Sequence, residues 1–268
     1  FDDSMNIKDV FKFVNTGTID KFIPLWNIQE MTYVKEKYIR PVINKNDLRA
    51  NFKRRYEQAI SKKIIITGIR YFEAILDRFG EYLAAKSTVI LRNKFSTDHL
   101  EYVLPILNSN LVFFYLKECY SSLAMDGGIN FSPANVSEIP IPKLTDSEKL
   151  KLIDISNKLM ELNEQFYREK LNTLSEFADK FNLKVNSKKI TNFYDYDTEV
   201  ISKEIKKQRD VVRVEELENY ISSQKKKLNN IQNKISDLFN EMDQFIYKLY
   251  GLGKEEVELL EEFKNNRR

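Results

Sequence analysis

The chain has few side chains suited to covalent catalysis or metal binding. Its 268 residues include a single histidine, His99, and a single cysteine, Cys119. A hydrolase of the triad type needs a histidine base beside a serine or cysteine nucleophile, and no Gly-x-Ser-x-Gly motif accompanies His99. We therefore expect His99 to be a surface or helix-start residue. One cysteine and one histidine cannot form a disulfide framework or a zinc site of the usual spacing within the chain.

Motifs for nucleotide and nuclease chemistry are also missing from the sequence. There is no phosphate-binding Gly-x-x-x-x-Gly-Lys-Ser/Thr loop, and Gly251-Leu252-Gly253 follows a predicted helix instead of a strand. No Pro-Asp dipeptide occurs, and the acidic residues are scattered instead of clustered to hold Mg²⁺. The Asn-Pro-Pro-aromatic motif of amino-directed DNA methylation is absent. We expect no catalytic residue, metal site or cofactor site in this chain, and interpret it as a binding protein.

Positive charge is concentrated in one part of the sequence. The whole chain has 43 basic and 40 acidic residues, but 15 basic and 6 acidic residues lie between Val34 and Phe95. Such an excess can serve as a footprint for a polyanion, because each neutralised phosphate releases condensed counterions. A solvated basic face is the alternative, and charge by itself does not decide between them.

Length and composition indicate a globular, helix-rich protein. Apolar residues make up 42% and charged residues 31%, with only seven glycines and six prolines. No apolar run approaches the roughly 18–20 residues of a membrane helix, so we expect no membrane partner. A lone cysteine fits a reducing, cytoplasmic location. Because the chain opens on Phe1 instead of Met, we expect it to be a piece of a longer polypeptide.

The first 145 residues mix short β-rich runs with turns. Two β-branched runs, Lys63–Ile69 and Ser87–Leu91, predict strands, with a glycine-closed turn between them at Asp77–Glu81. A helix is predicted from His99 to Tyr120, and Pro105 predicts a break in it near Asn108. Short extended pieces are predicted at Ile129–Phe131 and Ile139–Pro142.

Two long helices are predicted after residue 145. One runs from about Ser147 to Phe181, with Thr145 at its N-cap. The other carries apolar residues at alternating steps of three and four from Val214 to Leu249, with Gln224 the one polar member of this coiled-coil seam. The two helices can pair antiparallel across a polar, tyrosine-rich loop at 182–199, or the seam can mediate self-association between chains. A short amphipathic helix is predicted from Lys254 to Phe263.

These elements predict an α+β fold in three segments. Residues 1–60 are expected to be a linker and the N-terminal part of a first domain, and residues 61–145 the β-rich core of that domain, with a small mixed or antiparallel sheet. Residues 146–268 are expected to be a helical spacer of two long antiparallel helices and a short C-terminal helix.

An ordered series of motifs between Gly17 and Pro142 resembles the C-terminal specificity domain of N6-adenine DNA methyltransferases and of fused type IIG restriction-modification enzymes. The series comprises Gly17–Asp20 ahead of Trp26, Arg40–Ile43, Lys63–Ile66, Asp77-x-x-Gly80-x-Tyr82-Leu83, Lys86–Thr88, Ile106–Ser109, Gly127-Gly128 and Glu138–Pro142. Met242–Leu252 resembles the tail of these enzymes. Type I specificity subunits are similar but normally carry two such units, and no internal repeat occurs here.

The resemblance implies a target-recognition domain that reads bases in the major groove of double-stranded DNA. The parent protein would be an adenine-N6 DNA methyltransferase, with or without a fused endonuclease. S-adenosylmethionine, and Mg²⁺ if a nuclease is fused, would then bind the missing upstream part, whose methyltransferase domain is the expected partner in the same polypeptide. Gly17, Gly80, Asn108, Gly127 and Pro140 are interpreted as scaffold residues.

No family motif names the base-reading side chains, so we select them by chemistry. Arginine and lysine read guanine, asparagine and glutamine read adenine, and serine or threonine serve either, while most basic contacts hold phosphates. Tyr71 and Phe72 could stack on a base or wedge a step, although core packing is the alternative. The DNA-binding candidates are Lys62, Lys63, Arg70, Arg78, Lys86, Arg92 and Lys94, with Ser121, Ser122 and Asn130 in the loop after the interrupted helix.

Other functions remain open from the sequence. A helical interaction scaffold would explain the heptad pattern and would make the basic segment incidental. An RNA-binding protein would explain basic residues near tyrosine and phenylalanine, although no recognised RNA-binding module is present.

Overall fold

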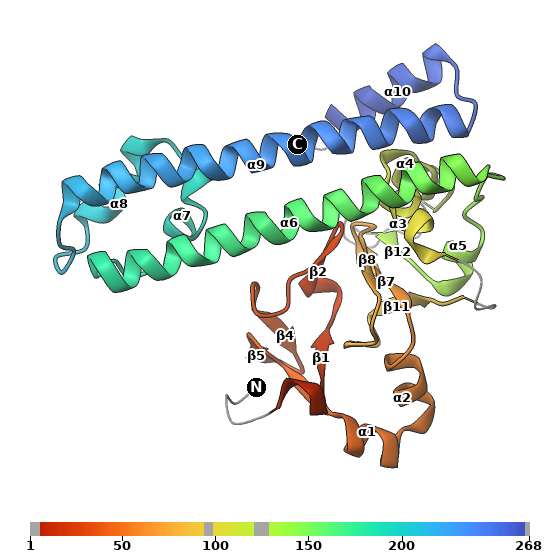
Figure 1. Cartoon of the computed structure of the whole chain (residues 1–268), viewed down its shortest axis with the longest axis horizontal. Coiled ribbons are helices and arrows are strands. Elements are labelled where there is room, and N and C mark those ends of the chain that lie inside the picture. Colours follow the sequence, from red (N-terminus) through yellow and green to blue (C-terminus); the bar gives the residue numbers. More distant parts are fainter. Residues whose placement is uncertain (1–5, 94–98, 121–128, 266–268) are drawn as a thin grey trace. The chain divides into compact units, whose positions relative to one another are not determined.

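The computed structural model describes residues 6–93, 99–120 and 129–265. It has the predicted α+β composition, with small sheets in the N-terminal part, two long helices packed together and a short C-terminal helix (Figure 1). Contacts divide the chain into two compact units, Phe1–Met160 with Asn240–Arg268, and Glu161–Phe239. In this division the residues from Asn240 onward belong to the unit that contains the sheets.

The sheets of the first unit are built from strands far apart in the sequence. Strand β1 (Val10–Val14) lies between β10 (Tyr82–Ala84), to which it is parallel, and β6 (Val42–Asn44), to which it is antiparallel. Strand β7 (Lys63–Thr67) lies between β11 (Thr88–Leu91) and β9 (Ala74–Asp77), both antiparallel. Because β1 and β10 share a sheet, residues near the start of the described chain and residues after β9 belong to the same compact unit.

The strands predicted at Lys63–Ile69 and Ser87–Leu91 are confirmed, and burial of their apolar side chains explains why they form. All five residues of β7 are buried, as expected for a β-branched run in the centre of a sheet. Val14, Ile19, Ile65, Ile75 and Ala84 form one buried cluster that joins the two sheets. The remaining two-stranded pairs are β2 (Ile19–Asp20) with β3 (Ile23–Pro24), β4 (Met31–Tyr33) with β5 (Glu36–Tyr38), and β8 (Ile69–Arg70) with β12 (Ile129–Asn130). The short helices are α1 (Lys45–Asn51), α2 (Lys53–Ala59) and α5 (Pro133–Ser137).

A buried ion pair holds the predicted turn after β9. Asp77 accepts hydrogen bonds from the backbone N–H groups of Glu81 and Tyr82, each at 3.0 Å, and from Lys63 Nζ at 2.5 Å. Lys63 Nζ also donates to the Ala59 carbonyl oxygen at 2.6 Å, at the end of α2. Burial lowers the pKa of the Lys63 ammonium group from its ordinary value, while the Asp77 carboxylate opposes that shift.

Gly80 closes this turn in a conformation that only glycine adopts without strain. Its φ is +67°, and a Cβ atom added to it would lie 2.2 Å from the Ile60 carbonyl oxygen. We predict that Gly80→Ala lowers the free energy of unfolding by about 2–5 kcal/mol, because backbone strain and overpacking add. The measurement is urea unfolding followed by the fluorescence of Trp26, the single tryptophan.

Gly251 supplies the matched control for that substitution. Its φ is +70°, but no atom lies within 4 Å of its added Cβ. Gly251→Ala should therefore lower the free energy of unfolding through backbone strain alone, by about 1–2 kcal/mol. Equal losses in the two variants would show that the approach of Ile60 does not constrain the turn.

The predicted helix break near Asn108 is confirmed, but Pro105 is not its main cause. Helix α3 (Val103–Asn108) carries Pro105 in its first turn, where proline is tolerated. The Asn108 side chain instead pairs with the backbone of Ala74 in β9, accepting from its N–H and donating to its carbonyl oxygen, both at 2.9 Å. Helix α4 (Asn110–Tyr120) then begins after Ser109, whose hydroxyl accepts from the Val112 N–H.

The C-terminal end of the long helix α9 (Val214–Leu249) returns to the start of α4. Asp243, 1% exposed, accepts from the backbone N–H of Asn110 at 3.0 Å and from its side-chain amide at 2.6 Å. Burial raises the pKa of the Asp243 carboxyl, against the opposing hydrogen bond from the Asn110 backbone. Tyr250 donates to the Pro140 carbonyl oxygen at 2.6 Å, and Phe263 of α10 (Lys254–Asn265) lies 5.1 Å from the ring of Phe114.

The contacts of Asp243, Tyr250 and Phe263 predict that the C-terminal residues stabilise the sheet-containing unit. Asp243→Ala leaves two buried donors of Asn110 without their acceptor and should lower the free energy of unfolding by about 2–4 kcal/mol. Asp237→Ala is the control, because Asp237 is exposed on the same helix, and it should change stability by less than about 0.5 kcal/mol. Trp26 fluorescence during urea unfolding measures the stability of both variants. Similar small changes in the two would mean that the contact between Asp243 and Asn110 does not support the unit.

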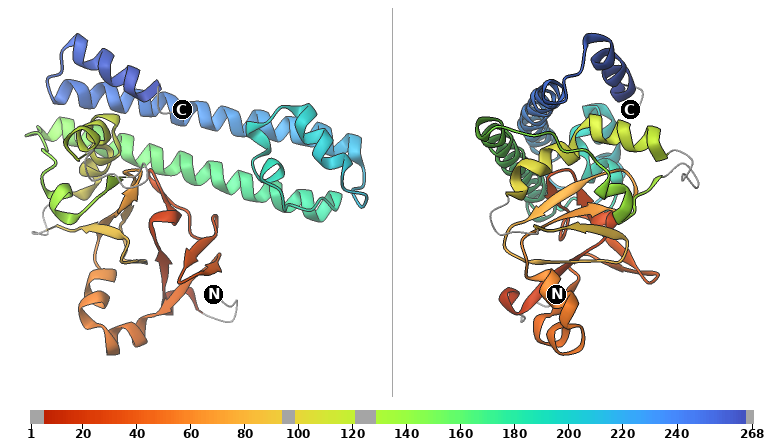
Figure 2. Two further views of the ribbon diagram at one scale, coloured as in Figure 1. Left: turned by 180° about the vertical axis from the view of Figure 1, so that it is seen from behind. Right: turned by 90° about the vertical axis from the view of Figure 1, so that its right-hand side faces the viewer.

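The second unit contains the greater part of two antiparallel helices, α6 (Asp146–Phe181) and α9 (Figure 2). Their contacts run in opposite directions: Thr173 lies opposite Gln224, and Glu169 pairs with Lys227 at 2.6 Å. Gln224, the polar residue of the predicted seam, thus lies against the buried Thr173, with 3.5 Å between their side-chain oxygens. Leu217, Ile221, Leu228 and Ile231 are buried along the seam.

The segment after α6 is more ordered than the predicted polar loop. It contains α7 (Lys188–Thr191) and α8 (Thr198–Lys206). The apolar residues Ile190, Phe193 and Ile201 of this segment are buried in the same cluster as the helix seam. The predicted polar loop at 182–199 did not anticipate these buried residues, because isolated apolar residues in a polar sequence carry no clear period. No helix in the described part of the chain is long and apolar enough to cross a membrane.

Candidate nucleic-acid interface

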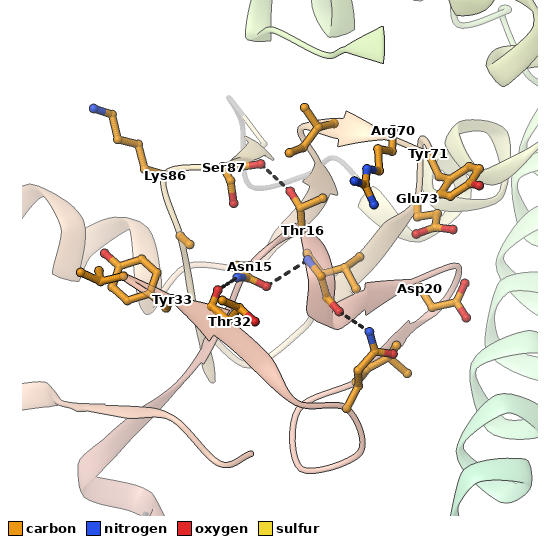
Figure 3. A pocket seen from close by; sticks show the side chains of 17 residues that line it. Asn15, Thr16, Asp20, Thr32, Tyr33, Arg70, Tyr71, Glu73, Lys86 and Ser87 are labelled. Carbon is orange, nitrogen blue, oxygen red and sulfur yellow. Dashed lines mark hydrogen bonds between the residues drawn. The ribbon is translucent and has the colours of Figure 1, made fainter. Parts of the chain in front are cut away.

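The first unit contains a cavity of about 990 Å³ (Figure 3), which we call the hairpin cavity. Its walls come from the short 3-10 helix Thr16–Thr18 with neighbouring residues, the β4–β5 hairpin, β8 and the residues that precede β11. The Thr16–Thr18 helix follows β1 and β8 follows β7, and these segments lie close together because β1 and β7 contribute Val14 and Ile65 to one buried cluster. The lining is mixed, with Asn15, Gln29 and Thr32 among polar neutral residues, Asp20 and Glu73 acidic, and Arg70 and Lys86 basic.

Thr16 joins three of these segments. Its hydroxyl donates to the Ser87 carbonyl oxygen at 2.6 Å and accepts from the Gly68 N–H at 3.2 Å. A Cβ on Gly68 would lie 2.3 Å from that same Ser87 oxygen, so only glycine permits the close approach. The Asn15 side chain donates to the Thr32 carbonyl oxygen at 3.0 Å and accepts from the Gly17 N–H, which ties the β4 strand to this wall.

Arg70 extends into the hairpin cavity from β8 (Figure 3). Its φ is +72°, in the left-handed region that residues with a Cβ rarely adopt. The guanidinium group is exposed, and it forms no hydrogen bond or ion pair with any residue in the described ranges. Strand β12 places Asn130 opposite Ile69, so that two predicted DNA-binding residues, Arg70 and Asn130, lie on adjacent strands.

The β4–β5 hairpin contributes residues that the sequence analysis missed. Val34 and Lys35 form its tip with φ values of +50° and +67°, and Val34 is 76% exposed. A turn with two positive φ values normally carries asparagine or glycine, and neither residue is present. The excess of positive charge that includes Lys35 was the one available signal in the sequence.

Comparison with known families matches residues 17–141 to the TaqI-like C-terminal specificity domain. Residues 17–141 are a TaqI-like C-terminal specificity domain. The match confirms the resemblance seen in the motif series and covers every wall of the hairpin cavity except Asn15 and Thr16. Such a domain is a non-catalytic part of type IIG restriction-modification enzymes, in which it implies a target-recognition role.

The helical part matches a second family. Residues 145–246 match a domain of unknown function (DUF8810), from the start of α6 nearly to the end of α9. No curated protein matches the chain.

Three of the predicted basic residues in the specificity domain hold the fold together. Lys63 is fully buried and pairs with Asp77, which leaves its ammonium group no surface for DNA. Lys62 and Arg78 both approach Glu101, with Lys62 Nζ at 2.6 Å, and Arg78 also donates to Asn157 of α6. Burial raises the pKa of the Glu101 carboxyl, but the hydrogen bond from Lys62 and the two cationic charges outweigh it and place that pKa below its ordinary value.

The other predicted basic residues of the specificity domain are free. Arg70, Lys86 and Arg92 are exposed, and none of them forms a hydrogen bond or ion pair with the described residues. Lys86 and Arg92 lie at opposite ends of β11, and only Lys86 borders the hairpin cavity with Arg70. Tyr71 is 58% exposed beside them, whereas Phe72 is buried against Phe131, which confirms core packing for Phe72. Lys94, Ser121 and Ser122 lie outside the described residues.

The hydrogen bonds of Thr16 predict that it maintains the wall of the hairpin cavity. Thr16→Val removes the partner of the Gly68 N–H and of the Ser87 carbonyl oxygen, and should lower the free energy of unfolding by about 1–2 kcal/mol. Thr32→Val is the control, because Thr32 contacts Asn15 only through its backbone carbonyl. Urea unfolding followed by Trp26 fluorescence measures both variants. Equal stabilities for the two would show that the Thr16 hydroxyl does not hold the wall.

Proposed function

We propose that this chain is the sequence-specific DNA-binding part of a restriction-modification enzyme that methylates adenine N6, of the type IIG or a related class. The observation that carries the proposal is the specificity domain, together with its free cations at the hairpin cavity. In this proposal the domain docks on double-stranded DNA through the face that carries Arg70, Lys86 and the β4–β5 hairpin. Methyl transfer with S-adenosylmethionine, and any Mg²⁺-dependent cleavage, belong to other parts of the parent enzyme.

The division of the basic residues supports this orientation. A lysine or arginine whose charge is paired inside the protein has less to gain from a phosphate, because the internal pair must first be broken or shared. Lys62, Lys63 and Arg78 are paired, whereas Arg70, Lys86 and Arg92 are left to solvent. The free cations therefore define the proposed DNA-facing side more closely than the total charge does.

The β4–β5 hairpin supports duplex DNA in particular. A two-stranded ribbon fits the major groove of B-form DNA, and the exposed tip at Val34 and Lys35 is narrow enough to enter it. The deep major groove of an RNA helix does not admit such an element. Duplex DNA is for this reason preferred over RNA as the partner.

The alternative of a helical scaffold loses its main support. The apolar seam of α9 is buried against α6 of the same chain at Leu217, Ile221 and Leu228. A seam already covered within one chain offers little apolar surface for a second copy. Self-association through this helix stays a lesser proposal, which sedimentation of the purified chain would test.

Selection from a randomised duplex library at roughly physiological salt, followed by sequencing of the bound fraction, tests the proposal directly. We expect enrichment of one short motif. Equal retention of all sequences, or no binding, would contradict a recognition role for this chain.

The contribution of the free cations is tested by removing two of them. Lys86→Ala with Arg92→Ala should weaken binding to all sequences and lower the slope of log affinity against log salt by about one for each lost phosphate contact. The control removes the same charge elsewhere, by Lys226→Ala with Lys234→Ala on the exposed side of α9. A slope lowered equally by both pairs would indicate net charge and not a docking face. Fluorescence anisotropy of a labelled duplex at several salt concentrations gives the slopes.

A further inference from the structure

Arg70 combines a strained backbone with a free side chain. A positive φ is unfavourable for a residue with a Cβ, and such strain persists only where the surroundings impose it. Here the surroundings are the β8–β12 pairing, in which Arg70 lies opposite Ile129, and a hydrogen bond from the Tyr71 N–H to the Ile69 carbonyl oxygen at 3.1 Å. Thr67 adds a third restraint by donating its hydroxyl to the Tyr71 carbonyl oxygen.

No contact of the Arg70 side chain within the described residues accounts for this strain. The Arg70 guanidinium group makes no hydrogen bond or ion pair with the described residues, although Asp20 and Glu73 line the same cavity. The backbone conformation instead directs the side chain into the hairpin cavity, whereas Lys86 extends away from it (Figure 3). A side chain held in place without an internal partner is pre-organised for an external one.

The lining of the hairpin cavity distinguishes between the two kinds of DNA group that arginine binds. A phosphate would be repelled by the carboxylates of Asp20 and Glu73, which border the same space. A base edge is neutral, and the amides of Asn15 and Gln29 with the hydroxyl of Thr32 are compatible with it. The planar guanidinium fork matches the O6 and N7 acceptors of guanine, which form the commonest specific arginine contact in the major groove.

We propose that Arg70 is a specificity-determining residue, which reads one guanine of the target through the major groove from within the hairpin cavity. This inference rests on the proposed function and adds to it a chemical identity for one base of the target. Lys86, on the rim, has the geometry of a phosphate contact that positions the domain without reading sequence.

The test repeats the duplex selection with the full 268-residue chain and two variants of Arg70. The wild-type motif should contain a guanine at one position, and Arg70→Ala should abolish the preference at that position alone while lowering affinity for the selected duplex about 10- to 100-fold. Arg70→Lys keeps the charge but loses the planar fork, so it should weaken the guanine preference less than Arg70→Ala does and keep the salt slope of the wild type. Lys226→Ala on α9, which also removes one exposed charge, should leave both the motif and the affinity unchanged.

A third variant separates recognition from folding. Arg70→Gly relieves the positive φ, so its unfolding midpoint should be no lower than that of the wild type, while the guanine preference is lost. A loss of preference in a protein of undiminished stability cannot be attributed to misfolding.

The outcomes keep this inference distinct from the proposed function. If the wild type selects a motif but Arg70→Ala leaves every position unchanged, Arg70 does not read a base. If Arg70→Ala weakens all duplexes equally and lowers the salt slope, Arg70 contacts phosphate, and the inference is overturned while the proposed function stands. If the wild type selects no motif at all, both are overturned.

Discussion

The buried pair of Lys63 and Asp77 is the interaction on which the specificity domain depends most. It joins the end of α2, the start of β7 and the turn after β9 at a single point. That turn leads directly into β10, which pairs with β1, so the geometry of one sheet is transmitted to the other through Asp77. Removing one partner of a buried ion pair leaves an uncompensated charge, which costs far more than the pair contributes when intact.

The same constraint divides the basic residues of the domain by role. Lys63 serves the turn, and its neighbour Lys62 meets Arg78 at Glu101, so three cations of the basic segment are used for folding. Of the predicted DNA-binding cations in the described ranges, those left to solvent lie at the ends of β11 and in β8. The number of basic residues in a segment therefore overstates its footprint for DNA, because it includes cations that are paired inside the protein.

Local patterns in the sequence predicted much of the fold. The β-branched run at β7, the glycine turn at Gly80 and the heptad seam of α9 each follow from a short-range rule, and all three are present. The burial of Lys63 could not be predicted, because its partner lies 14 residues away on another strand. The hydrogen bond between Asp243 and Asn110 joins residues 133 positions apart. It explains why aspartate occurs at position 243 of the C-terminal motif, which no local pattern could have shown.

The candidate site was predicted less completely than the fold, and the cause is physical. The hairpin tip at Val34 and Lys35, and Arg70 in β8, all have positive φ values without the glycine or asparagine that would normally signal them. Sequence rules describe residues that favour their own backbone conformation, and these residues do not. Where the fold imposes a backbone conformation that the residue type disfavours, a requirement other than stability has determined the residue. Val34 and Arg70 belong to two walls of the hairpin cavity and Lys35 to the turn beside one of them, so we take the cavity, more than the total basic charge, as the guide to the proposed site of DNA recognition.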